Sequence, residues 1–361
     1  MKVSESVRYV GADDHDIDLF EGQFHVPLGM AYNSYVILDD KIAVMDSVDG
    51  RFGDAWLSNI KKELAGREPD YLVVHHMEMD HSASIQKFTK TFPKAVIVAS
   101  RMAFTMMKCY FGDGFASDVA ARQLVVGEGS SLELGTHTLS FIAAPNVHWP
   151  EVLMSYETNE GILFSADAFG KFGANDTEDP EGWTCEARRY YFGIVGKFGP
   201  QVQAVLKKAI PLDIQKICPL HGPILDADIA EYLRLYDIWS SYGVESEGIM
   251  IAYASVYGNT KQAVEKLAEI LTARSCPKVI TADLAREDMY ENVENAFRYG
   301  TLVLAAPTYN GGVFPVMREF IEHLTERNYQ KRKIAFVENG SWAPAAAKAM
   351  RSLFDKGLEA G

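Results

Sequence analysis

The sequence has few cysteines and no long apolar run. Its 361 residues include only Cys109, Cys185, Cys218 and Cys276, and no two of them form a CxxC pair. An iron–sulfur or thiolate zinc site is therefore not expected, and in a reducing compartment these would be free thiols. No tract approaches the roughly 20 apolar residues that a membrane span needs. We therefore expect no membrane segment.

The amino terminus also lacks the pattern of a secretory signal. Its first twenty residues turn acidic within a dozen positions and contain no apolar core followed by small residues. A cytoplasmic location is the resulting expectation. The net charge of -14 would repel a phosphate backbone, which argues against a nucleic-acid partner.

Length and pattern predict two domains. A chain of 361 residues exceeds the size at which single cores stop growing. Up to about residue 246 short β-like runs outnumber helical stretches, and several runs end in His or Asp. From residue 249 strands and helices alternate strictly, which predicts a parallel sheet with helices on both faces. We place the domains at residues 1–246 and 247–361.

One cluster of metal-binding residue types stands out in the first domain. Residues 75–81 read HHMEMDH and follow the apolar run YLVV at 71–74. If that run is a buried strand, His76, Glu78 and Asp80 leave its carboxyl end at alternate positions, and His81 follows. Imidazole and carboxylate together suit zinc, iron or manganese. A salt-bridged strand end is the competing interpretation.

Three further strand ends carry isolated residues of the same kinds. They are His148 in NVHWPE, Asp167 in LFSADAFG and His221 in CPLHGP. Each alone would pass for a satisfied polar group in a core. Their occurrence together with the HHMEMDH cluster favours a metal site.

These motifs, in this order, resemble the metallo-β-lactamase-like domain of flavodiiron proteins, also called A-type flavoproteins. That domain is an αββα sandwich. Zinc hydrolases of the same superfamily usually carry HxHxDH, so Glu78 favours a di-iron site over a di-zinc site. The resemblance implies that one iron is bound by His76, Glu78 and His148, that the other is bound by Asp80, His81 and His221, and that Asp167 bridges both.

Three further positions lie near this ligand set in the sequence pattern or in the family. His75 should face away from His76 along a strand, so packing or support of a ligand is the expectation for it. Tyr190, in RRYYF, matches a tyrosine that the family places beside the di-iron pocket, where its hydroxyl would donate a hydrogen bond; a core or interfacial aromatic is the alternative. Many family members have a histidine where Phe172 stands, so no proton role is expected at that position.

The second domain carries a phosphate-loop pattern. The stretch ASVYGNT, residues 254–260, lies between a predicted strand and a predicted helix, where backbone N–H groups and hydroxyls converge on an anion. It lacks the GK[ST] ending of a nucleotide-triphosphate loop, which argues against ATP. Two more loops, PTYNGGVFP at 307–315 and ENGSWAPA at 338–345, follow strands of the same predicted sheet.

The resemblance extends to these loops, because flavodoxin-like domains place FMN across three of them. It implies FMN-binding positions at Ser255, Tyr257, Gly258, Asn259 and Thr260, at Pro307, Thr308, Tyr309, Asn310 and Gly311, and at Asn339, Gly340, Ser341 and Trp342. Tyr309 and Trp342 would flank the flat ring, although plain loop aromatics are the alternative. A flavodoxin-like domain would add a fifth strand and a closing helix where this sequence stops at Gly361. That strand and helix are therefore expected to be missing, or the sequence is cut short.

For the whole chain the resemblance implies an oxidoreductase with FMN and two iron ions. It would reduce dioxygen to water, nitric oxide to nitrous oxide, or both. It would take electrons from a separate donor, either a rubredoxin-like protein or a reduced deazaflavin, and act as a head-to-tail homodimer or homotetramer. A di-zinc hydrolase fused to a regulatory flavodoxin-like domain is the alternative, and Glu78 argues against it. An electron carrier with a metal-free domain is a third hypothesis, which the complete ligand set disfavours.

Overall fold

Two sheets packed face to face form most of the first half of the chain. The computed structural model describes residues 2–354, 359 and 360. The first sheet has the order β1 (Val7–Tyr9), β6 (Tyr35–Ile37), β7 (Ala43–Met45), β8 (Tyr71–Val74), β9 (Val96–Ala99) and β10 (Gln123–Val125). The second has the order β11 (Ser131–Glu133), β12 (Thr138–Ala143), β13 (Leu153–Glu157), β14 (Ile162–Phe164) and β15 (Lys216–Cys218).

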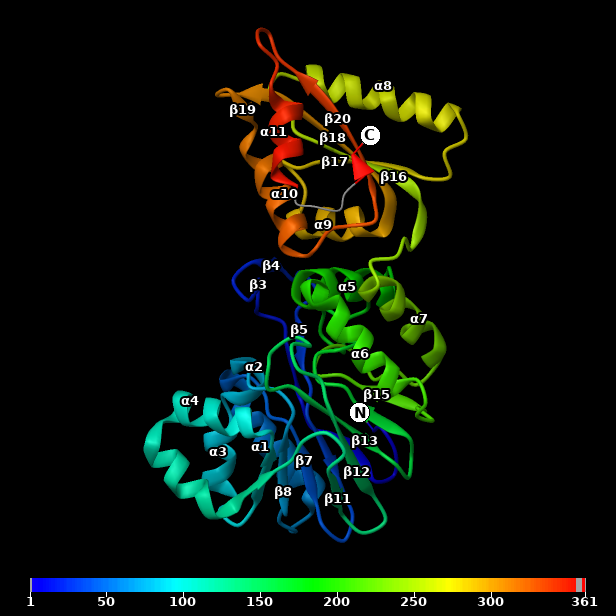
Figure 1. The fold of residues 1–361 in the computed structure, drawn as a ribbon. Coiled ribbons are helices and arrows are strands. Elements are labelled where there is room, and N and C mark those ends of the chain that lie inside the picture. The colour runs from blue at the N-terminus through cyan, green and yellow to red at the C-terminus, as the bar shows by residue number, and fades with distance from the viewer. Residues whose placement is uncertain (1, 355–358, 361) are drawn as a thin grey trace. The chain divides into compact units, whose positions relative to one another are not determined.

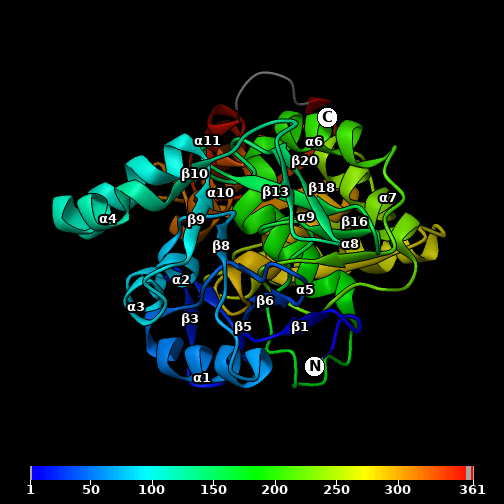
Figure 2. The ribbon, with the colours of Figure 1, turned by 90° about the horizontal axis from the view of Figure 1, so that it is seen from below.

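The core of this sandwich lies between the facing sheets. Apolar side chains of both sheets meet there, among them Val73, Val98, Phe141 and Phe164, each at most 2% exposed. The helices α1 (Gly53–Leu64), α3 (Ile85–Thr91) and α4 (Arg101–Val119) lie outside the first sheet, and α6 (Gly199–Ala209) lies beside the second (Figure 1). Seen from below, α4 extends outward past the edge formed by β9 and β10 (Figure 2). This is the αββα arrangement predicted from the sequence.

The flavodoxin-like half is a doubly wound parallel sheet, as predicted. Its strand order is β17 (Val279–Asp283), β16 (Ser246–Tyr253), β18 (Tyr299–Tyr309), β20 (Lys333–Asn339) and β21 (Glu359–Ala360). The short strand β19 (Gly312–Val313) pairs back onto the end of β18. The helices α9 (Met289–Arg298), α10 (Pro315–Glu326) and α11 (Ala346–Leu353) pack side by side, and α8 (Asn259–Ala273) lies on the other side of the sheet (Figure 1).

One expectation about this sheet was wrong. The fifth position was expected to be empty, but β21 pairs there in parallel with the start of β20, opposite Lys333 and Ile334. In the described residues this strand is two residues long, and Gly361 lies outside them. The order is therefore 2-1-3-4-5, with the three predicted flavin loops all preceding the edge strand.

Packing divides the chain into two units. The first contains residues 1–190 and 200–234, and the second contains residues 191–199 and 235–361. The segment 191–199 belongs to the second unit because the Arg327 guanidinium donates to the carbonyl oxygen of Phe192 at 2.8 Å and the Phe192 ring stacks on Phe297 at 4.1 Å. The residues after Ser240 are held by Arg332, which donates to the carbonyl oxygen of Tyr242 at 2.7 Å. The boundary near residue 246 stays a prediction.

The smaller elements of the first unit surround its carboxyl strand ends. β2 (Ala12–Asp14) pairs with β5 (Met30–Tyr32), and β3 (Leu19–Phe20) forms a hairpin with β4 (Phe24–His25). α2 (Met79–Ser82) follows β8, and α5 (Trp183–Tyr190) precedes the π-helical turn Tyr191–Val195 of the second unit. α7 (Ile229–Ser240) runs from the first unit into the second.

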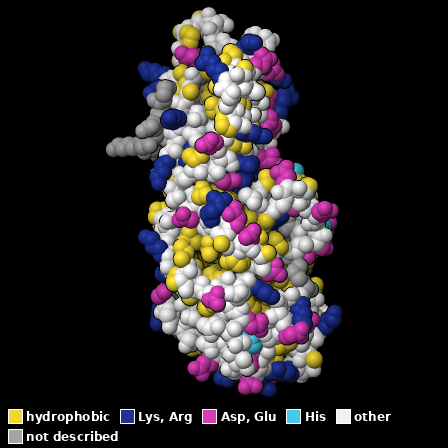
Figure 3. Space-filling view, turned by 90° about the vertical axis from the view of Figure 1, so that its right-hand side faces the viewer, with side chains coloured by type: hydrophobic (Ala, Val, Ile, Leu, Met, Phe, Trp, Pro, Cys, Tyr) yellow, Lys and Arg dark blue, Asp and Glu magenta, His cyan; other side chains and the backbone are white. Residues whose placement is uncertain are grey.

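Surface charge and helix character agree with the composition. On the face shown in Figure 3, acidic and basic side chains are interspersed, and the described part of that face has no large basic area. None of the helices in residues 2–354 combines the length and the apolar character needed to cross a membrane.

A buried ionic cluster ties four turns of the first unit together. His137, in the turn between β11 and β12, donates from Nδ1 to Asp39 Oδ2 at 2.7 Å, and its Nε2 lies 3.1 Å from Glu160 Oε1 and 2.9 Å from Ser6 Oγ. Burial alone would lower the pKa of His137, but the two carboxylates outweigh it and raise that pKa above its usual value. The His137 imidazole therefore connects the start of β1 to both sheets.

We expect His137→Gln to lower the free energy of unfolding by about 1–3 kcal/mol near pH 6, because charged hydrogen bonds are lost. The folded-state pKa lies above the unfolded value of about 6.5, so this contribution is complete below that pH and is lost as pH rises through the folded-state pKa. Urea unfolding at about pH 6 and pH 9 should show the difference from wild type shrinking at the higher pH.

The matched control is His15→Gln, because His15 is 53% exposed and pairs with the exposed Asp176. It should change stability little at either pH. Equal destabilisation by His137→Gln at both pH values would contradict the ionic assignment.

Candidate functional site

The residues of the HHMEMDH stretch lie partly in irregular backbone and partly in a helical turn. The strand predicted at 71–74 is β8, and His76 and Glu78 lie in the irregular stretch directly after it. The alternate spacing predicted for Asp80 does not hold, because Met79–Ser82 forms the helical turn α2. That turn places Asp80 and His81 in a different group from His76 and Glu78.

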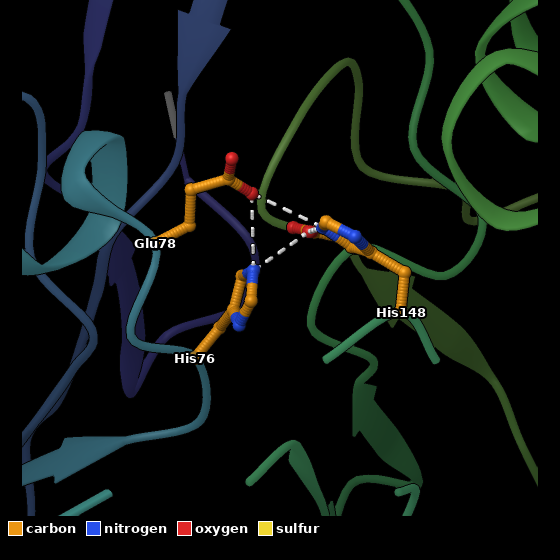
Figure 4. A group of neighbouring side chains, drawn as sticks. His76, Glu78 and His148 are labelled. Carbon is orange, nitrogen blue, oxygen red and sulfur yellow. Dashed lines mark hydrogen bonds and ion pairs between the residues drawn. The ribbon is translucent and has the colours of Figure 1, made fainter. Parts of the chain in front are cut away.

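The first group contains His76, Glu78, His148 and Asp167, whose ligand atoms all lie within 4.8 Å of one another. Figure 4 shows the two imidazoles and the Glu78 carboxylate turned toward a common point. Glu78 Oε2 lies 3.3 Å from His76 Nε2 and 3.1 Å from His148 Nε2. Asp167 Oδ2 lies 3.3 Å from His76 Nε2 and 3.0 Å from His148 Nε2.

The second group contains Asp80, His81 and His221. Asp80 Oδ2 lies 3.2 Å from His81 Nε2 and 3.3 Å from His221 Nε2, and the two Nε2 atoms are 2.9 Å apart. The other carboxylate oxygen of Asp167, Oδ1, lies 3.5 Å from His81 Nε2 and 3.8 Å from His221 Nε2. Asp167 therefore presents one oxygen to each group.

Several donor atoms of the two groups are buried without a hydrogen-bond partner, and metal ions would provide the missing partners. Among the described residues, both carboxylate oxygens of Asp80, Oδ1 of Asp167 and Nε2 of His148 are buried without a hydrogen bond of acceptable geometry. Leaving such groups unpaired is costly, and a cation is the partner that carboxylates and neutral imidazoles share. The seven side chains offer four nitrogen and three carboxylate ligands, a set that suits iron, manganese or zinc.

The charges of the side chains already stabilise the ionised carboxylates. Burial alone would raise the pKa of Asp167, but His76, His148 and His81 outweigh it and hold that pKa well below its usual range. Burial alone would lower the pKa of His148, but Asp167 and Glu78 raise it to about 9. The ionised Asp167 carboxylate thus faces the His148 imidazole, whose proton a metal ion would replace.

Hydrogen bonds behind the site fix two of the imidazoles. His76 Nδ1 donates to Glu151 Oε1 at 2.8 Å, and His221 Nδ1 donates to the carbonyl oxygen of Ala31 at 2.7 Å. Each bond turns Nε2 toward the centre, which is the usual supporting arrangement for histidine ligands. Sequence reasoning missed Glu151, although the HWPE motif contains it.

His75 lies outside both groups, as expected. Its Nδ1 pairs with Asp46 Oδ2 at 2.5 Å, and its Nε2 lies 2.8 Å from Ser155 Oγ. Tyr190 is buried at the end of α5, and its ring centroid lies 5.5 Å from that of His221. The structure thus brings Tyr190 to the second group.

The second unit contains a cavity of about 530 Å³ at the carboxyl ends of β16, β18 and β20. Its lining includes all but one of the predicted flavin positions: Ser255, Tyr257, Asn259, Thr260, Pro307, Thr308, Tyr309, Asn310, Gly311, Asn339, Gly340, Ser341 and Trp342. The remaining one, Gly258, is the residue before α8 and has a φ of 87°, a conformation that favours glycine. Val256 and Ala343 also line the cavity and were not predicted.

The rim of this cavity suits a flat ring. Tyr257 is 91% exposed, Trp342 is 82% exposed and Tyr309 is 44% exposed, so three large aromatic side chains meet solvent around one cavity. A stacked planar ligand would cover that apolar surface. The Thr308 hydroxyl also has a structural role. Its oxygen accepts hydrogen bonds from the backbone N–H groups of Ala345 and Ala346 at 2.9 and 3.2 Å and so caps α11.

Comparisons with known proteins match both halves of the chain. Residues 30–222 match the family described as ODP family beta lactamase, and residues 250–359 match a flavodoxin domain. The chain is 29% identical to a protein of Moorella thermoacetica named nitric oxide reductase. The match extends over 357 residues and covers 96% of this chain and 88% of that protein.

Two solved structures share the fold across nearly the whole chain. The flavodiiron protein from Giardia intestinalis matches with a TM-score of 0.89 at 24% identity, over 99% of this chain and 90% of that chain. The rubredoxin oxygen:oxidoreductase from Desulfovibrio gigas matches with a TM-score of 0.89 at 22% identity, over 100% of this chain and 92% of that chain.

A beta-lactamase-like domain followed by a flavodoxin domain thus makes up most of this chain, and both solved structures share its fold. The chain belongs to the ODP family of beta-lactamase-like proteins, and its relatives and structural neighbours are flavodiiron proteins.

Proposed function

We propose that the protein is an FMN- and di-iron-dependent oxidoreductase that reduces nitric oxide to nitrous oxide, dioxygen to water, or both. The observation that carries this proposal is the placement of Asp167, whose two oxygens face two separate groups of ligands. A carboxylate between two metal ions is the typical device for holding them about 3.5–4 Å apart. The names of the relatives from Moorella and Desulfovibrio support the reaction class.

In this proposal His76, Glu78 and His148 bind one iron ion, and Asp80, His81 and His221 bind the other. Iron held there would supply one-electron redox chemistry to a small diatomic molecule. The fold keeps most of these groups away from solvent: four of the seven side chains are at most 2% exposed. Glu78, with 19% of its side chain exposed, and Asp80, with 11%, lie on the more open side.

The FMN would lie in the cavity of the second unit. Ser255, Asn259 and Thr260 stand at the start of α8, where the helix N-terminus favours a phosphate group. Tyr309 and Trp342 would pack against the ring. FMN can accept two electrons together and pass them on one at a time. It could therefore link a two-electron donor to iron ions that accept single electrons.

Tyr190 is the proposed catalytic side chain. Its ring lies against His221, so its hydroxyl belongs to the immediate surroundings of the second group. From there it would donate a hydrogen bond to substrate oxygen and stabilise charge that develops during reduction.

A separate electron donor and self-association complete the proposal. The donor would be a rubredoxin-like protein or a reduced deazaflavin, and the name of the Desulfovibrio relative refers to rubredoxin. A head-to-tail homodimer or homotetramer would bring the FMN of one copy to the iron of another. We place the protein in the cytoplasm.

Anaerobic reoxidation tests the proposed reaction. Protein containing FMN and iron is reduced, then mixed with nitric oxide or with dioxygen, while flavin absorbance and metal content are measured. Rapid reoxidation of the flavin by at least one gas is expected. A flavin that stays reduced with both gases in the iron form, together with hydrolytic activity of a zinc form, would favour a di-zinc hydrolase instead.

We expect Asp167→Ala to lose most of the bound iron from both positions while FMN stays bound, because the substitution removes one oxygen ligand from each group. Metal analysis and flavin absorbance measure the two cofactors separately. The matched control, Asp176→Ala, changes an exposed aspartate of the same unit and should keep both. Unchanged iron content in Asp167→Ala would contradict the bridging role.

We expect Thr260→Ala to weaken FMN binding about tenfold, because one buried hydroxyl partner of the phosphate is worth about 1.4 kcal/mol. Flavin titration of the apoprotein gives the dissociation constant, and iron content should not change. Thr272→Ala, at the exposed far end of the same helix, is the control. Equal affinity in wild type and Thr260→Ala would remove Thr260 from the phosphate site.

A further inference from the structure

We propose that Phe172 is a positioning residue that holds Tyr190 and the ligand His221 in place beside the second metal group. This inference rests on the proposed function and goes further by assigning a task to a residue that touches neither metal ligand atoms nor cofactor in the described contacts. Its basis is a cluster of aromatic rings on one side of the site.

Phe172 lies at the centre of this cluster and is 1% exposed. Its ring centroid lies 5.1 Å from that of Tyr190 at an interplanar angle of 68°, 5.4 Å from that of Phe24 and 5.9 Å from that of Phe20. The Arg189 guanidinium carbon lies 4.6 Å from the same centroid. Edge-to-face rings and a stacked guanidinium each add directional attraction to the apolar burial.

Two of the rings that touch Phe172 also touch the imidazole of His221. The centroid of Phe20 lies 5.4 Å from that of His221 at 80°, and the centroid of Tyr190 lies 5.5 Å from it at 54°. The backbone carbonyl of Ala31 fixes Nδ1 of the same imidazole. His221 is therefore held by one hydrogen bond and contacted by the rings of Phe20, Tyr190 and Tyr32. Phe20 and Tyr190 also pack against Phe172.

Phe172 also joins three segments that are distant in sequence. Phe20 and Phe24 come from the β3–β4 hairpin, Tyr190 comes from the end of α5, and Phe172 follows Asp167 by five residues. Arg189 strengthens the junction, since it donates to the carbonyl oxygen of His25 at 2.8 Å while it covers the Phe172 ring. Shrinking Phe172 would open space at the point where all three segments meet.

The first metal group has different surroundings. His76 and His148 contact the ring of Trp149, at 5.2 and 6.0 Å between centroids, and Phe172 is absent from their described ring contacts. A change at Phe172 should therefore act on the second group and leave the first unchanged. That asymmetry separates a positioning role from general support of the fold.

The test compares Phe172→Leu with Phe141→Leu in protein loaded with ⁵⁷Fe and FMN. Phe141 is equally buried, at 1% exposed, but lies in the core between the two sheets. Mössbauer spectra of the resting protein should show one of the two iron signals altered in Phe172→Leu, and neither altered in Phe141→Leu. Phe172→Met, which preserves more volume, should give a smaller change at the same signal.

A double-mutant cycle with Tyr190→Phe tests the link to the tyrosine. Phe172→Leu should slow flavin reoxidation by nitric oxide or dioxygen about tenfold, and adding Tyr190→Phe should slow it little further, because both substitutions disable the same hydroxyl. Rate losses that multiply would overturn the proposal, as would identical iron spectra for Phe172→Leu and wild type. If the wild type itself is not reoxidised, the proposed function fails, whereas the spectra still decide the role of Phe172.

Discussion

The arrangement of the first unit depends on the carboxylate of Asp167. Its two oxygens face different pairs of imidazoles, at 3.0–3.3 Å on one side and 3.5–3.8 Å on the other. Three carboxylates and four imidazoles share this buried space, and ionised carboxylates there need positively charged partners because burial removes their hydration. Under the proposed function, two metal ions would supply this positive charge, and Asp167 would bridge them.

The sandwich serves this centre by bringing strand ends together. The residues that follow β8, β14 and β15, together with the loop before β13, contribute the proposed ligands. The buried core between the sheets sets the spacing of these ends, and Glu151 and the Ala31 carbonyl turn individual imidazoles. The flavodoxin unit follows the same rule, since its cavity lies where three parallel strands end.

The positions of the first proposed ligands were predictable, because these residues directly follow a strand that its apolar sequence identifies. The apolar run at 71–74 and the polar residues after it predicted the first proposed ligands, and the structure brings His76 and Glu78 together. That Glu78 favours iron stays a prediction. The helical turn at Met79–Ser82 was not predicted, because four residues contain too little periodicity to indicate a helix. Its effect is large, since it assigns Asp80 to a different group from Glu78.

Other features follow from tertiary contacts that no local pattern encodes. Thr308 sits in a predicted flavin loop, yet its hydroxyl caps α11, a helix that begins 38 residues later. The segment 191–199 packs with the flavodoxin unit because the buried Arg327 binds its carbonyl oxygens. Phe172 reads as an ordinary aromatic in the sequence, and only its ring contacts show that it joins three distant segments.

The most direct test of the two-metal centre is anomalous X-ray diffraction from crystals of the iron-loaded protein, recorded on both sides of the iron absorption edge. The account predicts two iron peaks per chain with the Asp167 carboxylate between them, one beside His76 and His148 and the other beside His81 and His221. A single peak, or scattering that appears at the zinc edge instead, would contradict it.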